Sequence, residues 1–516
     1  MLSEPKVSIT TSSAGSIPSA TEHKVLMVGQ MTSDGTATAG ELNESLALNN
    51  EAALFGTRSM LTEMIQNFRK VNKETRLDVI PLADDSTEEA VAATSTITFE
   101  GTASAAGTFT LSVGSKNEHT YTLAIANEDT HLNAADALKA LIDADTTAQF
   151  TAASTTGVVT LTMANKGPEG NLTGILISGS TAGLTATITT FANGATNPAL
   201  TSAFDVVADE VYQTVIAPYS YEISFLTDFL SDRWNVENNE LSGVGIMCTT
   251  DSLADLKAAV ASINEQTFVL VGNKEVAETT YYGGAILEYP ANIAAQTGAV
   301  RSLRLTSSAK ISDYVVSSGS ALDKIGGPAL STLPYFNTPM PYLPLVPTGK
   351  GFTMAEAAEL EDAYVSVIDN NRAGNSIILG PMVTTYATDS AGNTDTVFKY
   401  LNSVDATMIA ASFMFNSLKQ DYAQSRLTDG DLIDGRAIAN TGKITASFVK
   451  YFNELSGEDY VIAQAGEDAL QYFKTNLTVT VDTEAGQVTA TMILPIVSQV
   501  REFVVPVSIT FSVLGA

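Results

Sequence analysis

Few residues of this chain have the type and spacing that enzyme chemistry requires. The three histidines, His23, His119 and His131, are far apart, and none forms the i, i+4 pair of a helical metal site. A histidine-dependent catalytic triad or a multi-histidine metal site is therefore not expected. The single cysteine, Cys248, lies in an apolar Gly-Ile-Met-Cys run. A core thiol is expected there rather than a nucleophile, because a reactive thiolate needs an electropositive setting.

Three loops match ligand-binding motifs only in part. Gly349-Lys350-Gly351 lacks the spacing and the hydroxyl of a phosphate loop, and the glycines around Val244 lack the third glycine of a dinucleotide site. Segment 429–435 (DGDLIDG) is similar to a calcium loop but lacks a bidentate glutamate at the required distance, so a solvated turn is the better interpretation. We therefore expect no catalytic residue, no cofactor and no metal ion.

The composition excludes several classes of protein. The 516 residues predict three or four domains, and 45% apolar with 16% charged residues excludes a disordered chain. Lys and Arg number 27 against 57 Asp and Glu, a net charge of −30, which argues against binding nucleic acid or an anionic membrane. The N-terminus has no basic leader with an apolar core, and no 18-residue apolar run occurs. We therefore expect no export signal, no membrane insertion, and folding in a cytoplasm.

Strands and helices alternate in two stretches of the chain. Strands are predicted at 25–28 and 76–82, with a helical segment at 50–72 that is broken near Gly56. The alternation resumes after residue 195, with strands at 212–217, 244–247 and 268–271 and helices at 221–234, 252–266 and 283–303. This pattern predicts a layered, discontinuous outer α/β domain made of residues 23–94 and 196–325.

Residues 95–195 differ in amino-acid composition from the rest of the chain. They hold 8 acidic and 3 basic residues and are rich in Thr, Ala, Gly and Ser. Alternating strands are predicted at 96–99, 108–113, 119–123, 157–162 and 185–189, with one helix at 133–142. The segment is therefore interpreted as a small β-rich module inserted into the outer domain.

The C-terminal third predicts an α+β domain. Residues 326–350 are rich in proline and should be extended, as a segment that crosses from the outer domain to a domain at 351–516. That domain has predicted helices at 354–360, 401–424 and 444–455 and a strand at 363–368. Alternating residues at 477–481 and 488–494, on either side of a turn at 482–487, predict an antiparallel hairpin.

The two ends of the chain are candidate linker strands. Residues 1–22 are a polar arm that cannot form a core alone, and in it Val7 and Ile9 alternate with polar residues. This arm either frays or orders on a partner. The last strand has one apolar face, made of Phe503, Val505, Val507, Ile509, Phe511 and Val513. Pro506 indicates an edge position, so this strand either completes the sheet of its own domain or pairs with a strand from another copy.

Several motifs occur in the order found in one known family. Residues 49–84 contain ALFG-x-x-S before a Met-rich helix and a V-x-PL-x-D strand, and the insert contains GTASAAGTFTLSVG and VTLTMANKGPEGN. Val383-Thr384-Thr385-Tyr386 precedes AGNTD at 391–395, the long helix and Arg426-Leu427. Over nearly its whole length the chain thus resembles the contractile tail sheath proteins of Mu-like bacteriophages.

The resemblance implies a mechanical, non-enzymatic protein of the virion tail. Such subunits would stack as hexameric rings in a helix around a tail tube, contact baseplate and terminator proteins, and assemble in the cytoplasm of a host bacterium. Contraction would drive the tube through the host envelope. The N-terminal arm and the C-terminal strand would be exchanged between copies, with the C-terminal domain facing the tube and the insert outermost.

Other functions stay open at this point. A sheath of a phage-derived contractile injection system would have the same features. A tail-tube or other virion shell protein would share the acidity and the strand exchange but should lack a large α/β core. A surface adhesin is suggested by the Thr-rich insert, although the absence of an export signal opposes it. A hydrolase within the α/β core would have no recognisable catalytic residue.

Overall fold

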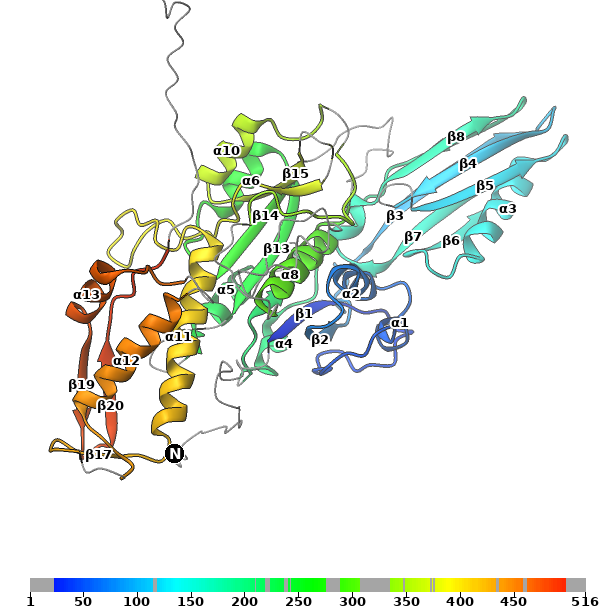
Figure 1. Ribbon diagram of the computed structural model, residues 1–516. Helices are drawn as coiled ribbons and strands as arrows, with labels where there is room; N and C mark the ends of the chain where they lie inside the picture. Colours follow the sequence, from blue (N-terminus) through cyan, green and yellow to red (C-terminus); the bar gives the residue numbers. More distant parts are fainter. Residues whose placement is uncertain are drawn as a thin grey trace, which may run out of the picture.

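The structure, a computed structural model, describes most of the chain between residues 23 and 497. The described residues are 23–114, 118–208, 210–218, 223–235, 240–241, 243–274, 288–306, 335–346, 349–371, 374, 376–432, 436–457 and 462–497. They form a central sheet with helices on both faces, an elongated β-rich insert on one side, and a helical unit with a hairpin on the other (Figure 1). The predicted class, a multidomain chain of α/β and α+β parts, is confirmed.

A seven-stranded sheet lies at the centre of the molecule. Its order is β16-β15-β14-β13-β10-β1-β2, and all neighbours are parallel except the antiparallel pair β15–β16. The strands are β1 (Lys24–Gln30), β2 (Arg76–Leu82), β10 (Thr214–Ile216), β13 (Val244–Asp251), β14 (Phe268–Lys274), β15 (Ser366–Asn370) and β16 (Ser376–Leu379). Continuous apolar runs such as VLMV in β1 suit strands that are buried on both faces.

Helices cover both faces of this sheet, and alternate residues of β1 point to opposite sides. Val25 and Met27 pack with α1 (Glu51–Phe55), α2 (Met60–Val71) and α8 (Pro290–Thr306). On the other face, Leu26 and Val28 pack with α4 (Thr201–Asp205), α5 (Ile223–Ser231), α6 (Leu253–Val260) and α10 (Met354–Asp362). A short pair, β11 (Trp234–Asn235) and β12 (Glu240–Leu241), lies beside α5. Helix α8 is buried along most of its length, from Ala291 to Arg304.

The sheet extends further along the chain than the sequence predicts. Strands β15 and β16 belong to it, although their residues fall within the C-terminal domain that we expected to begin at 351. The strand at 363–368 was predicted, but its partner was not. Its pairing joins Val271 to Ser366, and a contact between residues so distant in the chain has no local signal in the sequence.

The break between α1 and α2 explains the ALFG-x-x-S motif in physical terms. Gly56 has φ +91°, and a Cβ at this position would lie 1.9 Å from Thr32 Oγ1. The Ser59 hydroxyl then caps α2 by accepting from the backbone N–H of Thr62 at 3.1 Å. The glycine and the serine are thus required by one turn, three residues apart.

The insert folds around its own core. It contains a four-stranded sheet of order β6-β7-β3-β9 and a three-stranded sheet of order β5-β4-β8. Its elements are β3 (Ala92–Gly101), β4 (Gly107–Val113), β5 (His119–Ile125), α3 (His131–Asp143), β6 (Phe150–Thr155), β7 (Val158–Lys166), a 3₁₀ turn (Pro168–Leu172), β8 (Ile175–Ser180) and β9 (Leu184–Ile188). The five predicted strands and the helix are confirmed. Strands β6 and β8 were missed, because FTAAST and ILISGS carry small residues where alternation would need larger apolar ones.

The C-terminal unit packs three helices and a hairpin around a separate core. It contains α11 (Leu401–Tyr422), β17 (Arg426–Leu427), β18 (Ile438–Ala439), α12 (Thr441–Leu455), α13 (Glu467–Thr475), β19 (Thr478–Asp482) and β20 (Gln487–Thr491). The predicted hairpin is confirmed, with Val479 opposite Ala490. Among the described residues, no helix combines the length and the hydrophobicity that crossing a membrane requires.

Replacing Gly56 by alanine should lower the free energy of unfolding by roughly 2–4 kcal/mol, because the new methyl group meets both a left-handed backbone and a close neighbour. Gly40→Ala is the matched control: its φ is +82° and no atom lies within 4 Å of the added Cβ, so about 1–2 kcal/mol is expected. Urea unfolding followed by circular dichroism measures both losses. Equal losses would show that the close approach at Gly56 costs nothing.

Candidate functional site

The carboxyl end of β1 lies where open α/β sheets commonly bind ligands. The strand order reverses at β1, since β2 and β10 lie on its two sides, and such a switch point usually leaves a crevice at the carboxyl ends of the strands. Here the crevice at β1 holds residues of the insert. Gln30 at the end of β1 donates to Asp84 Oδ1 and to the Lys166 carbonyl, both at 2.8 Å. Asn165 also donates to Asp84 Oδ1, at 3.0 Å.

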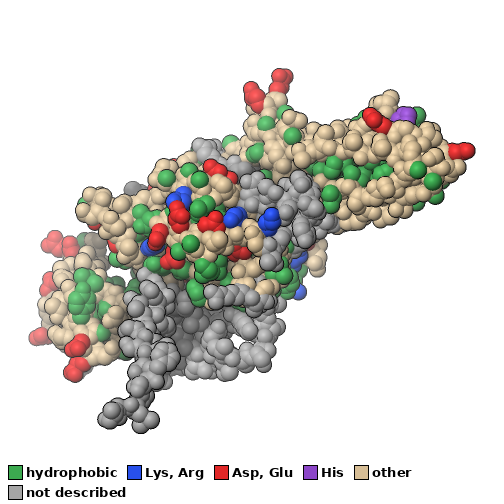
Figure 2. All heavy atoms as spheres, turned by 90° about the horizontal axis from the view of Figure 1, so that it is seen from above, with side chains coloured by type: hydrophobic (Ala, Val, Ile, Leu, Met, Phe, Trp, Pro, Cys, Tyr) green, Lys and Arg blue, Asp and Glu red, His purple; other side chains and the backbone are tan. Residues whose placement is uncertain are grey.

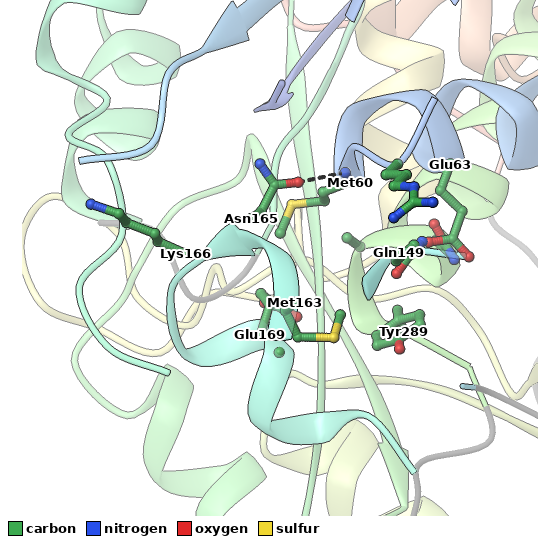
Figure 3. A pocket seen from close by; sticks show the side chains of 12 residues that line it. Met60, Glu63, Gln149, Met163, Asn165, Lys166, Glu169 and Tyr289 are labelled. Atoms are coloured by element: carbon green, nitrogen blue, oxygen red, sulfur yellow. Dashed lines mark hydrogen bonds between the residues drawn. The ribbon is translucent and has the colours of Figure 1, made fainter. Parts of the chain in front are cut away.

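A cavity of about 40 Å³ remains between the insert and helices α2 and α8 (Figure 3). On one side Asn165 Oδ1 accepts from the Met60 N–H at 2.9 Å. A residue of the insert thus supplies the hydrogen-bond acceptor that this N–H, in the first turn of α2, cannot find within the helix. On the other side the Tyr289 hydroxyl bonds Thr173 Oγ1 at 2.9 Å. Lys166 points away from the cavity and donates to the Asp85 carbonyl at 3.2 Å. The space suits a few water molecules and is too small for an organic substrate.

Glu63 of α2 lines this cavity, and Asn292 of α8, which also lines it, joins Glu63 to the nearby carboxyl group of Glu288. Asn292 Nδ2 donates to Glu288 Oε1 at 2.9 Å and also bonds the Glu63 side chain. Burial raises the pKa of Glu63 well above the usual carboxyl range, and the charges of Glu288 and Glu118 raise it further, against the weaker effects of Asn292 and Lys70. Glu63 therefore holds its proton to a higher pH than an exposed glutamate does. A raised carboxyl pKa is a feature of general acids, but the lining side chains of this cavity include no Ser, Thr, Cys or His.

At the opposite end of the sheet, where the parallel strands begin, a buried ion pair joins the core to the C-terminal unit. We call this end the amino edge, and the end at which the parallel strands finish the carboxyl edge. Arg301 of α8 and Asp405 of α11 are both fully buried, and Arg301 Nη2 lies 2.7 Å from Asp405 Oδ1. Arg301 Nη1 donates to the Gln213 carbonyl and to Thr214 Oγ1 at the start of β10. The Tyr335 hydroxyl donates to Asp405 Oδ2 at 2.8 Å. Both charges thus have several partners, as a buried pair requires.

His23 lies beside this ion pair and is the first described residue of the chain. Burial, and then the positive charge of Arg301, lowers its pKa to about 3, so the ring is neutral at physiological pH. Strand β1 begins at the next residue. Residues 1–22 are therefore joined to the core at the same edge of the sheet as the Arg301–Asp405 pair.

The hairpin of the C-terminal unit presents open strand edges. In the described part of the chain, β19 and β20 pair only with each other. Val479 is buried in the core of this unit, and Val481 and Ala490 pack against it. Beyond the hairpin, the Gln464 N–H donates to the Pro495 carbonyl at 2.8 Å and the Val497 N–H to the Ile462 carbonyl at 2.9 Å. Two strands alone make a marginal sheet, so these edges are suited to accept further strands.

The linker residues that the sequence singles out lie outside the described residues. These are Val7, Ile9, Phe503, Val505, Val507, Ile509, Phe511 and Val513, and their pairing stays a prediction. Cys248 lies in β13, where burial raises the pKa of its thiol, as expected for a core cysteine. Segment 429–435 is described only to Leu432, and Asp429 accepts from Thr483 Oγ1 at 3.1 Å. Among the described residues, no group of three or more His, Cys, Asp or Glu side chains could hold a metal ion.

Sequence reasoning missed Glu63 and the Arg301–Asp405 pair. A weak signal existed for the pair, because Arg301 follows a run of small and apolar residues in α8 and Asp405 lies next to Val404 of the apolar side of α11. A lone charge on an apolar helix often has a buried partner. Which residue is the partner could not be read from the sequence, since Arg301 and Asp405 are 104 positions apart.

Comparison with known proteins finds a relative by sequence, and no family model matches the chain. The Mu-like prophage FluMu tail sheath protein of Haemophilus influenzae is 30% identical over 266 residues, which are 50% of this chain and 53% of that protein. The match thus spans about half the length of this relative. Over that part, the resemblance to tail sheath proteins of Mu-like phages is confirmed.

A solved structure is also similar to the chain. The sheath tail protein of Desulfitobacterium hafniense is 12% identical, with 95% of this chain and 100% of that chain covered and a TM-score of 0.45. A TM-score at this level is too low to establish a shared fold.

Replacing Asp405 by alanine should cost about 3–5 kcal/mol of unfolding free energy, because Arg301 would stay buried without its carboxylate. Asp143→Ala, which breaks the exposed Lys139–Asp143 pair, is the control and should cost at most about 0.5 kcal/mol. The double variant Arg301→Leu/Asp405→Leu should be more stable than Asp405→Ala alone. Urea unfolding measures all three, and a loss for Asp405→Ala no larger than that of the control would contradict a structural role for the pair.

Glu63 should make stability fall as pH rises. Because its folded pKa is raised, the folded chain holds a proton that the unfolded chain loses above about pH 4.5, so stability declines from that pH upward until the folded group also ionises. Glu63→Gln should therefore match the wild type at about pH 4 and exceed its melting temperature at pH 8. Glu100→Gln, at an exposed carboxyl of the insert, should leave the pH dependence unchanged. An identical pH profile for wild type and Glu63→Gln would rule out this effect.

Proposed function

We propose that this chain is a structural subunit of a contractile phage tail sheath. It polymerises around a tail tube as stacked rings, and contraction of the polymer drives the tube through the host envelope. The observation that carries this proposal is the 30% identity to a Mu-like prophage tail sheath protein over half the chain. We propose no enzymatic activity and no cofactor.

The two ends of the central sheet support a role in bearing load. At the carboxyl edge the insert is held by Asn165 and Thr173, and at the amino edge the C-terminal unit is held by the buried Arg301–Asp405 pair. Helix α8 takes part in both contacts, through Tyr289 just before its start and Arg301 near its end. Force applied to either outer part therefore acts on one connected body.

Strand exchange would link such bodies into a polymer. The arm residues Val7 and Ile9 and the strand at 503–513 would pair with open edges such as those of β19 and β20 on neighbouring copies. In this proposal, the exchanged segments would keep these backbone pairs while the bodies that they link rotate. The domains proposed are the arm at 1–22, the outer domain at 23–94 plus 196–325, the insert at 95–195, the crossing segment at 326–350 and the C-terminal domain at 351–516.

The partners follow from the same proposal. Copies of the chain form hexameric rings stacked helically in the virion tail, after assembly in the cytoplasm of the host bacterium. The tail tube, baseplate and terminator proteins are the other contacts. The C-terminal domain faces the tube and the insert lies outermost, an arrangement supported by their positions at opposite edges of the sheet (Figure 1). A sheath of a derived injection device is the alternative, and the large α/β core disfavours a tube protein.

Two backbone-blocking substitutions test the linking role without shortening the chain. Val7→Pro with Ile9→Pro removes two backbone donors, so the variant should fold like the wild type but remain monomeric in sedimentation velocity. The control Ser8→Ala with Thr10→Ala keeps every backbone donor and should polymerise. Deletion of residues 503–516 should also abolish polymers.

Negative-stain electron microscopy of the wild type should show hollow striated cylinders wider than a tube. Polymers of normal length from both the proline variant and the deletion would refute strand exchange. A wild type that stays monomeric at high concentration would refute the sheath proposal itself.

A further inference from the structure

A proline-rich strip forms the outer edge of the central sheet beside β16. We use the name Pro-rich strip for residues 335–346. Pro339 bridges Ile377 in antiparallel fashion, the Met340 N–H donates to the Ser376 carbonyl at 2.9 Å, and the Ile378 N–H donates to the Thr338 carbonyl at 2.9 Å. The strip therefore covers the backbone edge that β16 would otherwise expose.

The Pro-rich strip has a buried side and an apolar exposed side. Tyr335, Met340 and Leu343 point inward and are at most 8% exposed. Phe336 and Leu345 are 52% and 51% exposed, and Tyr342 is 37% exposed. Large apolar side chains gathered on one exposed segment indicate a contact surface.

The inward side chains hold the strip rigidly in place. The Tyr335 hydroxyl donates to buried Asp405, and Arg304 Nη2 donates to Thr338 Oγ1 at 2.7 Å. At the other end, Asn370 Nδ2 donates to the Val346 carbonyl at 2.6 Å. Binding at the exposed side therefore needs little further ordering, which favours association.

A partner of the strip would find exposed side chains there but few backbone N–H groups to pair with. Pro339, Pro341 and Pro344 carry no N–H, so a strand from another molecule would find gaps in the ladder of donors. Strand exchange of the kind proposed for β19 and β20 is therefore disfavoured here. A partner should instead pack against Phe336, Tyr342 and Leu345.

The distribution of charged residues along the chain favours one kind of partner for the strip. The sequence has no charged side chain from residue 325 to 349, although the chain carries a net charge of −30. The arm at 7–20 and the end at 503–516 are also free of charge. A basic partner would be drawn to the acidic surface, whereas a second acidic copy meets least repulsion at an uncharged segment.

We propose that the Pro-rich strip is a packing surface between copies of this chain, distinct from the exchanged strands. This inference rests on the proposed polymer. It adds a second type of contact, in which Phe336, Tyr342 and Leu345 are covered by a neighbouring copy when the chain assembles.

A single introduced thiol tests this inference, because the native Cys248 is buried. Leu345→Cys places a reactive group on the strip, and Leu132→Cys, 46% exposed on the insert, is the matched control. Maleimide labelling rates are compared between dissociated chains and assembled polymers. The rate at residue 345 should fall about tenfold or more on assembly, because interface cores exclude solvent, while the rate at residue 132 should change by less than about twofold.

The possible outcomes distinguish failure of the proposed packing surface from failure of the sheath proposal. If Leu345→Cys forms polymers in which its thiol is labelled as fast as in the monomer, the strip is not a packing surface, and the sheath proposal is unaffected. Failure of the wild type to polymerise would overturn both. If Leu345→Cys folds but does not assemble while Leu132→Cys does, a packing role for the strip is supported. In that case Phe336→Ser should raise the critical concentration for assembly by about tenfold, or 1.4 kcal/mol. An unchanged critical concentration for Phe336→Ser would count against it.

Discussion

The buried ion pair between Arg301 and Asp405 is the interaction on which the arrangement of the parts depends. Removing two charges from water is costly, and the cost is offset only where each charge has several well-placed partners. Gln213, Thr214 and Tyr335 supply these partners, so the pair forms only when α8, β10, α11 and the Pro-rich strip are all in place. The pair therefore fixes the position of the C-terminal unit on the core more specifically than apolar packing alone would.

Helix α8 extends this constraint to the other edge of the sheet. It runs along one sheet face, and Tyr289, just before its start, contacts Thr173 of the insert. Gly298 allows close packing, because a Cβ there would lie 2.4 Å from Ile216 Cδ1. The crevice where α/β sheets usually bind ligands is thus used to attach the insert. Function depends on the site and not on the fold, and in this fold residues of the insert lie where a ligand usually binds.

The sequence predicted local structure well and distant pairing poorly. Parallel strands read as apolar runs, the hairpin showed period-two alternation, and the Gly56 break was visible, because each depends on neighbouring residues. Helix α13 was missed: its EDALQYFKT is mostly polar, and in it only Phe473 is buried. That β15 pairs with β14 of the central sheet was not visible in the sequence, because its partner strand is distant in the chain. Glu63 and Asp405 could not be identified as site residues, since their roles come from groups on other elements.

The acidity of this chain opposes the assembly that we propose for it. Copies that each carry −30 repel one another, so contact between them is favoured where charge is absent. The uncharged segments at 7–20, 325–349 and 503–516 are distributed over both ends and the middle of the sequence, and the surface of the insert in Figure 2 is mostly uncharged as well. Elsewhere the acidic surface keeps copies apart. If copies assemble as proposed, contacts at these uncharged segments would meet less charge repulsion than contacts elsewhere on the surface.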